Sequence, residues 1–245
     1  YDMINRGVIN MSTLKLFILD EADQMLNKGF KEQIIEILKF VPEKSQIAIY
    51  SATMPNDILL LTKEFMKDPV KILVKKEDLT LEGSSQYYIS LETEQEKYET
   101  LCDLYKSISV GQSMIYCSSK KKVIWLSEKL SEEGYPVSSI HGDITQVDRD
   151  KIMKSFRKGE TRVLITTDLL ARGIDVRSVS LVINYDLPED MQSYIHRIGR
   201  TGRFGRKGWA INFVMKTDDK YMRTIENYYH TQITEMPESI PDLIK

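Results

Sequence analysis

Two adjacent acidic residues, Asp20 and Glu21, stand directly after an apolar run at residues 14–19. A short run of branched and aromatic residues is typical of a buried strand, so both carboxylates are expected at its carboxyl end, where open α/β sheets bind ligands. There Asp20 could hold Mg²⁺ through oxygen, and Glu21 could orient or deprotonate an attacking water. From these residues alone, an acidic loop after any strand is the equal alternative.

Hydroxyl side chains follow a second strand-like run, at residues 46–50, in the triplet Ser51-Ala52-Thr53. Such hydroxyls can hydrogen-bond a carboxylate, so we expect them to contact Asp23 and to respond to the nucleotide state. For the triplet alone, an ordinary loop whose Ser and Thr cap the next helix is the simpler interpretation.

Three arginines recur at every third position, Arg197, Arg200 and Arg203, within the sequence HRIGRTGR at residues 196–203. Guanidinium groups match phosphate oxygens bidentately, and the intervening glycines let the backbone approach a ligand closely. A solvated basic face rarely alternates its arginines with glycines. This segment therefore predicts a phosphate-binding site.

A strand-to-turn segment at residues 166–175 reads TTDLLARGID. Asp168 could cap a helical turn, and Gly173 permits a sharp bend. Arg172 is then a candidate phosphate contact, and Asp175 a candidate acceptor for a sugar hydroxyl. A normal strand–turn–helix connection is the alternative interpretation.

The start of a predicted helix at residues 145–158 carries two polar side chains on one face, Gln146 and Arg149. Thr145 and Asp148 resemble a capping box, which would open the helix there. With the helix N-terminus, the two side chains could hold a phosphodiester. A solvated helix face is the equal alternative.

Strand-like and helical patterns alternate through most of the chain, which predicts parallel βαβ units and a doubly wound α/β fold. Strands are expected at 14–19, 46–50, 70–74, 86–91, 112–117, 137–141, 162–167, 179–184 and 208–214. Helices are expected at 29–40, 56–66, 94–108, 119–133, 145–158, 188–198 and 217–230. The charged, non-periodic segment 76–85 predicts a linker between two domains.

Composition argues against a globally basic nucleic-acid-binding protein and against a membrane-spanning helix. The 245 residues carry a formal net charge of −2, so nucleic-acid contacts must come from local patches. Cys102 and Cys117 fit no metal-ligand spacing and are expected to be buried, reduced thiols. No apolar run approaches membrane-spanning length. Because the first residue is Tyr1, we expect the chain to be a fragment whose targeting signal could be missing.

Together these motifs resemble the DEAD-box RNA helicases of superfamily 2, in the order and spacing of that family. The resemblance is carried by LDEADQMLNKGF (19–30), SATMP (51–55), KKEDLTLEG (75–83), INYDLP (183–188) and YIHRIGRTGRFGRKG (194–208). It is closest to members that act in translation initiation and in the exon-junction complex. It implies RecA-like parallel sheets flanked by helices, with one partial and one complete domain. Residues 1–75 would form the C-terminal part of the first, ATP-binding domain, 76–85 the linker, and 86–245 the second, helicase C-terminal domain.

The resemblance also implies roles for single residues, with ATP and Mg²⁺ as cofactors. Asp20 and Glu21 would serve Mg²⁺ and the attacking water, while Arg200 and Arg203 would act as arginine fingers on the γ-phosphate. Hydrolysis would be linked to domain closure by Asp23, Ser51, Ala52, Thr53 and His196. The nucleotide would meet Asp175 and Gly173, the RNA path would be lined by Gln146, Arg149, Thr167 and Arg172, and Arg197 would be structural.

The implied function is an ATP-dependent RNA helicase that separates short RNA duplexes in translation initiation and releases ADP and phosphate. It would grip RNA by the backbone, with little sequence preference, as a monomer in the cytoplasm, or in the nucleus if it is the exon-junction relative. A scaffold protein of the initiation complex or exon-junction proteins would be its partners, and it would not bind a membrane. None of the twelve glycines is followed by lysine, so the family's Gly-Lys-Thr phosphate loop is missing and the chain alone is expected to be inactive. A fragment that only binds RNA or a partner, an exon-junction clamp and a DNA-acting motor remain alternatives.

Overall fold

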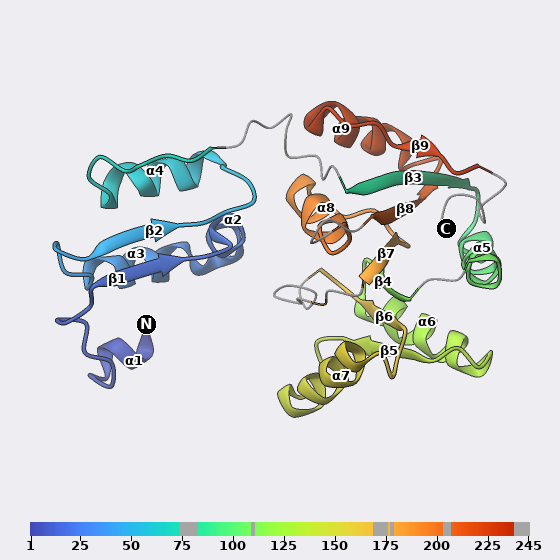
Figure 1. Ribbon diagram of the computed structural model, residues 1–245, viewed down its shortest axis with the longest axis horizontal. Coiled ribbons are helices and arrows are strands. Elements are labelled where there is room, and N and C mark those ends of the chain that lie inside the picture. Colours follow the sequence, from blue (N-terminus) through green and yellow to red (C-terminus); the bar gives the residue numbers. More distant parts are fainter. Residues whose placement is uncertain (74–82, 109–110, 169–175, 177–178, 203–206, 238–245) are drawn as a thin grey trace. The chain divides into compact units, whose positions relative to one another are not determined.

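The structure, a computed structural model, falls into two compact units, residues 1–73 and 74–245 (Figure 1). It describes residues 1–73, 83–108, 111–168, 176, 179–202 and 207–237, without the side chains of residues 27 and 28. Within the described residues, no helix has both the length and the apolar character needed to cross a membrane.

The first unit is built on a two-stranded parallel sheet, in which β1 (Leu16–Leu19) pairs with β2 (Gln46–Ile49). Its helical elements are α1 (Asp2–Asn5), α2 (Ala22–Met25), the π-helical turn η1 (Leu26–Phe30), α3 (Lys31–Lys39) and α4 (Asn56–Phe65). Residues Ile34 and Leu38 of α3 lie four apart, on one helix face, and they pack with Leu19 and Ile58 into one apolar cluster. This cluster packs α2, α3 and α4 against the sheet.

The second unit contains a seven-stranded parallel sheet with the strand order β5-β6-β4-β7-β8-β3-β9. Its strands are β3 (Ser84–Leu91), β4 (Gln112–Tyr116), β5 (Val137–Ile140), β6 (Val163–Thr166), β7 (Val179–Asn184), β8 (Gly208–Met215) and β9 (Thr234–Glu235). Its helices are α5 (Glu94–Ser107), α6 (Lys120–Glu132), α7 (Gln146–Lys158), α8 (Met191–Ile198) and α9 (Asp219–Tyr229). The predicted α/β fold with parallel sheets is confirmed.

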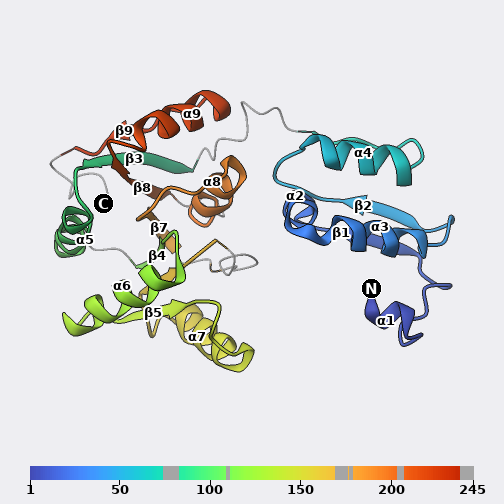
Figure 2. The same cartoon turned by 180° about the vertical axis from the view of Figure 1, so that it is seen from behind.

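Helices cover both faces of this sheet, as the two opposite views show (Figures 1 and 2). Helices α5 and α6 share one apolar cluster with the sheet, whereas α7 packs into a second cluster and α8 and α9 into a third. Every residue of β4 and β6 is buried, as expected for inner strands of a covered parallel sheet. The carboxyl ends of the inner strands therefore form a well-defined edge at which loops can present side chains.

Side-chain caps determine where several helices begin. Thr93, Ser119, Thr145 and Asp190 each accept a hydrogen bond from the backbone N–H three residues ahead, at the starts of α5, α6, α7 and α8. The predicted cap at Thr145 is confirmed, because its Oγ1 accepts from the Asp148 amide at 3.2 Å. These caps fix the first turns that carry candidate site residues.

Both cysteines are buried, as predicted. Cys102 is 5% exposed and Cys117 is 1% exposed, and neither forms a disulfide. Burial raises the pKa of each thiol above its usual value.

Several predicted boundaries were wrong. The strand expected at 70–74 is absent over its described part, residues 70–73, where Val70 and Ile72 are 90% and 89% exposed. An apolar run becomes a strand only where a neighbouring strand supplies hydrogen bonds, and neither β1 nor β2 pairs with this one. The helix expected from residue 29 begins at Lys31, because the π-helical turn precedes it and Gly29 there has φ of 75°. The sequence did not predict α1, α2 or β9.

We predict that backbone amides of β6 exchange with solvent more slowly than those of β1. Strand β6 pairs with β4 and β5 and is buried throughout, whereas β1 pairs with β2 and exposes Leu16 and Ile18 by 46% and 55%. Hydrogen–deuterium exchange of the 245-residue chain, read by mass spectrometry, measures both strands in one sample. Equal protection would mean that some other segment shields β1.

Candidate functional site

The acidic pair lies where the chain turns out of β1 into α2. Asp20 is exposed, and its Oδ1 accepts a hydrogen bond from the Glu21 amide at 2.9 Å. Glu21 caps α2 with φ of 52° and ψ of 41°, a left-handed conformation that a residue with a Cβ adopts only at a cost. The Ala22 amide donates to the Tyr50 carbonyl at 3.1 Å, which ties this turn to the end of β2. Strain of this kind tends to gather at functional sites.

Asp23 is fully buried and is held by the loop after β2. Its Oδ2 accepts from Thr53 Oγ1 at 2.7 Å and from the Thr53 amide at 3.3 Å, while its own amide donates to Ser51 Oγ at 3.0 Å. Its Oδ1 accepts from the Gln24 amide at 2.9 Å. The predicted contact between Asp23 and these hydroxyls is confirmed, and Ala52 lies between them in the same loop.

The buried side chain of Arg197 connects α8 to the loops after β6 and β7. The side chain is 2% exposed, and its Nε and Nη2 donate to the two carboxylate oxygens of Asp168 at 2.5 and 2.6 Å. Its Nη1 donates to Asn184 Oδ1 at 3.0 Å and to the Asp186 carbonyl at 2.7 Å. The structural role predicted for Arg197 is confirmed. Both carboxylate oxygens of Asp168 accept from this guanidinium, whereas the helical turn that Asp168 was expected to cap lies outside the described residues.

A line of buried polar side chains continues from Arg197 across the sheet. Asn184 Nδ2 donates to Asn212 Oδ1 at 2.8 Å, Asn212 Nδ2 donates to Tyr194 Oη at 3.3 Å, and Tyr194 Oη donates to Gln86 Oε1 at 2.8 Å. Because these groups come from β7, β8, α8 and β3, they fix the register of α8 on the sheet. Sequence reasoning missed them, although a lone Asn within an apolar strand is a signal that a buried partner is required.

Two more candidate residues lie at the end of α8. His196 is half-buried, and Arg200, just past the helix, is 7% exposed. Arg200 Nε donates to the His196 carbonyl at 3.1 Å, so the backbone of the last helical turn helps orient its guanidinium. The structure thus brings His196 and Arg200 together, whereas Arg203 lies outside the described residues.

The candidate RNA contacts follow two neighbouring strands, β5 and β6. Gln146 and Arg149 stand in the first turn of α7, after β5, and Thr167 directly follows β6. Gln146 is exposed and donates to Asp150 Oδ1 at 2.9 Å. Arg149 is half-buried, and within the described part of the chain its Nε has no hydrogen-bond partner. Arg172, Gly173 and Asp175 lie outside the described residues.

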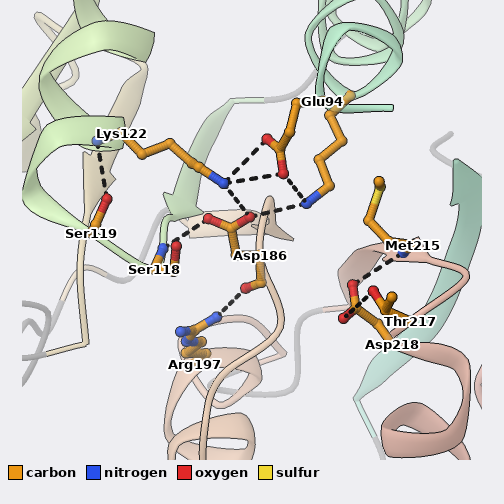
Figure 3. A network of polar contacts seen from close by, with 10 residues as sticks. Glu94, Ser118, Ser119, Lys122, Asp186, Arg197, Met215, Thr217 and Asp218 are labelled. Carbon is orange, nitrogen blue, oxygen red and sulfur yellow. Dashed lines mark hydrogen bonds and ion pairs between the residues drawn. The ribbon is translucent and has the colours of Figure 1, made fainter. Parts of the chain in front are cut away.

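A second ionic centre, around Asp186, joins α5, α6 and the loop after β7 (Figure 3). Asp186 Oδ1 accepts from Lys122 at 2.8 Å and from Lys97 at 3.0 Å, and Oδ2 accepts from the Ser118 amide at 2.9 Å. Glu94 contacts both lysines. Burial acts to raise the pKa of the Asp186 carboxyl, but the Lys122 and Ser118 hydrogen bonds and the charge of Lys97 outweigh it and lower the pKa to about 2.

We predict that Thr53→Val destabilises the chain by about 1–3 kcal/mol, because the buried Asp23 carboxylate loses its hydroxyl donor. Guanidinium denaturation followed by circular dichroism measures the free energy of unfolding. Thr53→Ser keeps the hydroxyl and serves as the matched control, with most of the stability retained. If Thr53→Val were as stable as the wild type, the bond at 2.7 Å would contribute nothing.

We predict that Asp186→Asn lowers the free energy of unfolding at neutral pH and flattens its pH dependence below about pH 4. The folded pKa lies below that of an unfolded aspartate, so the carboxylate stabilises the fold above the unfolded pKa, and this contribution of about 2 kcal/mol is lost as the pH falls toward the folded pKa.

The measurement is denaturant unfolding of wild type and variant at a series of pH values. Asp103→Asn, at a carboxylate whose side chain is 74% exposed, is the control and should keep the wild-type slope. If Asp186→Asn kept the wild-type pH dependence of the free energy of unfolding at acid pH, the ion cluster would not be its cause.

Comparison with known proteins gives the family. Residues 1–61 match the family described as DEAD/DEAH box helicase, and residues 96–205 match the helicase conserved C-terminal domain. The chain is 56% identical over 243 residues to eukaryotic initiation factor 4A of Caenorhabditis elegans, with 99% of this chain and 60% of that protein covered. It is 55% identical over 244 residues to the ATP-dependent RNA helicase eIF4A of Schizosaccharomyces pombe, with 100% of this chain and 62% of that protein covered. The chain thus spans about three fifths of the length of these curated relatives.

Solved structures agree with this assignment. Dbp5 of S. cerevisiae bound to RNA and ADP BeF3 is 36% identical, with a TM-score of 0.92, 99% of this chain covered and 66% of that chain. The C-terminal domain of the DEAD-box protein Dbp5 is 40% identical, with a TM-score of 0.62, 67% of this chain covered and 98% of that domain. With the acidic turn after β1 and the arginine segment of α8 in place, these likenesses show that the chain belongs to the DEAD-box family of RNA helicases.

Proposed function

We propose that the protein containing this chain hydrolyses ATP to ADP and phosphate and uses the reaction to separate short RNA duplexes. The observation that carries the proposal is the turn after β1, where the exposed Asp20 and the half-buried Glu21 lie beside a buried Asp23 that is hydrogen-bonded to Thr53. Relatives that are identical to this chain at more than half of the aligned positions are named ATP-dependent RNA helicases. Since the chain spans about three fifths of their length, the proposal concerns the full-length protein.

In this proposal the first unit supplies the acidic groups of the reaction. Asp20 fits Mg²⁺, because it is an exposed carboxylate at the carboxyl end of a strand, and Mg²⁺ prefers oxygen ligands and phosphate. Bound Mg²⁺ offsets negative charge on the phosphates. Glu21 orients or deprotonates the attacking water. Asp23, Ser51, Ala52 and Thr53, together with His196 of the second unit, then link hydrolysis to domain closure.

The second unit supplies the positive charge. Arg200 and Arg203 stabilise charge that develops on the γ-phosphate, Asp175 accepts from a ribose hydroxyl, and Gly173 lets the backbone approach the nucleotide. For Arg200 the support is its fixed position at the end of α8, because a guanidinium oriented in advance costs little reorganisation during the reaction.

RNA is held through its backbone in this proposal. Gln146, Arg149, Thr167 and Arg172 present donors, and none of these four residues is aromatic and able to stack on a base. Phosphate contacts of this kind carry no direct sequence information, so RNA is bound with little sequence preference. The partly buried Arg149, whose Nε lacks a described partner, supports a role in binding a phosphate.

The names of the relatives favour translation initiation as the setting. In this proposal the protein acts as a monomer in the cytoplasm beside a scaffold protein. Residues 1–75 then belong to the first RecA-like domain, 76–85 to the linker and 86–245 to the second domain. The division of the chain near residue 73 and the two matched family segments support these boundaries.

We predict that Arg200→Ala lowers the ATP turnover of the full-length protein by about 10³-fold or more, with a much smaller change in ATP affinity. A group that meets the phosphate mainly in the transition state contributes to turnover and little to ground-state binding, and arginine fingers are worth on the order of 10³–10⁵ in rate.

Steady-state phosphate release with saturating RNA gives kcat, and a fluorescent ATP analogue gives the dissociation constant. Arg157→Ala, at an exposed arginine in the last turn of α7, is the matched control and should turn over ATP like the wild type. Thermal melting confirms that both variants are folded. Near-normal turnover of folded Arg200→Ala would refute the proposed role.

A further inference from the structure

The backbone that follows Arg200 is packed tightly against the start of β3. The Oγ of Ser84, the first residue of β3, lies 3.0 Å from Thr201 Oγ1. Gly202 has φ of 68°, and a Cβ added there would lie 2.9 Å from both the carbonyl carbon and the oxygen of Gly83. The segment that presents Arg200 is therefore in direct contact with the residues that lead into β3.

A second strand, β8, also takes part in this contact. The amide of Gly208, the first residue of β8, donates to the Gly83 carbonyl at 2.8 Å. A Cβ added at Gly208 would lie 2.4 Å from Thr201 Cβ and from the Gly202 amide nitrogen. Real Cβ atoms do not approach other atoms so closely, so three backbone segments meet here with no room for a side chain. Small displacements of the segment after Arg200 are strongly restricted.

The donor in the hydrogen bond between Ser84 and Thr201 can be deduced. Thr201 Oγ1 donates its single hydrogen to the Ile198 carbonyl at 3.2 Å, so the hydrogen between the two hydroxyls must come from Ser84. Ser84 thus donates to Thr201, and Thr201 donates to the last residue of α8. Because Thr201 is 1% exposed, water cannot readily replace either bond.

We propose that Ser84 and Thr201 are positioning residues: they hold the backbone next to Arg200 so that its guanidinium meets the nucleotide phosphate in the productive orientation. The inference rests on the proposed role of Arg200. It extends that role to β3, whose first residue then contributes to the reaction without touching the nucleotide. The rate of a reaction that depends on preorganised charge falls when the supporting contacts are loosened, even where ground-state binding does not change.

The test compares kcat and KM for ATP in the full-length protein with saturating RNA. Ser84→Ala and Thr201→Val each remove the bond between the hydroxyls, and we expect each to lower kcat by about three- to tenfold, the range of a single hydrogen bond. KM for ATP should change by less than about twofold if only the transition state is affected. Thr201→Ser keeps both bonds and should restore most of the wild-type kcat.

Ser85→Ala is the matched control, because Ser85 is the neighbouring residue of β3 and is exposed. Its kcat should equal that of the wild type. Thermal melting of every variant separates loss of fold from loss of positioning. If Thr201→Val fails to fold, Ser84→Ala decides the question alone. A destabilised Ser84→Ala with unchanged kcat would overturn the inference, since the bond would then be structural only.

A double-mutant cycle with Arg200→Ala identifies the residue through which Ser84 acts. If Ser84 works through Arg200, Ser84→Ala should cost little in the Arg200→Ala background, within about 1.5-fold, because residues that act as a unit are not additive. A full three- to tenfold loss in that background would overturn the inference and leave the role of Arg200 intact. Wild-type turnover of Arg200→Ala itself would overturn the proposed role of Arg200, and the inference with it. Absence of ATP turnover in the wild-type full-length protein would overturn the proposed function itself.

Discussion

The buried guanidinium of Arg197 is the interaction on which the second unit's site depends. A buried charge is tolerated only when it is paired and hydrogen-bonded, and Arg197 has Asp168, Asn184 and the Asp186 carbonyl for this purpose. Removal of one partner from such a pair typically costs about 3–5 kcal/mol, since the other charge is left buried. These contacts join α8 to the ends of β6 and β7, so the helix that carries His196 cannot rotate independently of the sheet.

The two units hold their acidic and basic groups by different means. In the first unit, a short sheet and a residue in the left-handed conformation position the acids, and the hydroxyl of Thr53 in the loop after β2 fixes Asp23. In the second unit, a line of buried polar side chains and a close meeting of glycine backbones fix the arginine segment. The acids of the first unit follow the carboxyl end of a strand, where open sheets bind ligands, whereas the segment after Arg200 packs against the first residues of β3 and β8.

Much of the fold could be predicted because its strands are apolar runs separated by helical patterns, and because caps such as Thr145 are local signals. The contact of Asp23 with Thr53 could also be predicted, since both follow strands that pair. The pairing of Asp168 with Arg197 could not, because Arg197 lies on α8 and only the tertiary fold places that helix against the end of β6. The Asp186 cluster was missed for the same reason: its lysines read as solvated helix residues, yet the Lys97 side chain is 3% exposed.

The burial of both native cysteines has a practical consequence for studies of motion. Thiol-reactive dyes attack the thiolate, and Cys102 and Cys117 are shielded and have raised pKa values, so they will label slowly under native conditions. A reporter cysteine can therefore be introduced at an exposed position of each unit without removing the natural ones. Single-molecule energy transfer between two such dyes would then follow how the distance between the units changes as nucleotide and RNA are added.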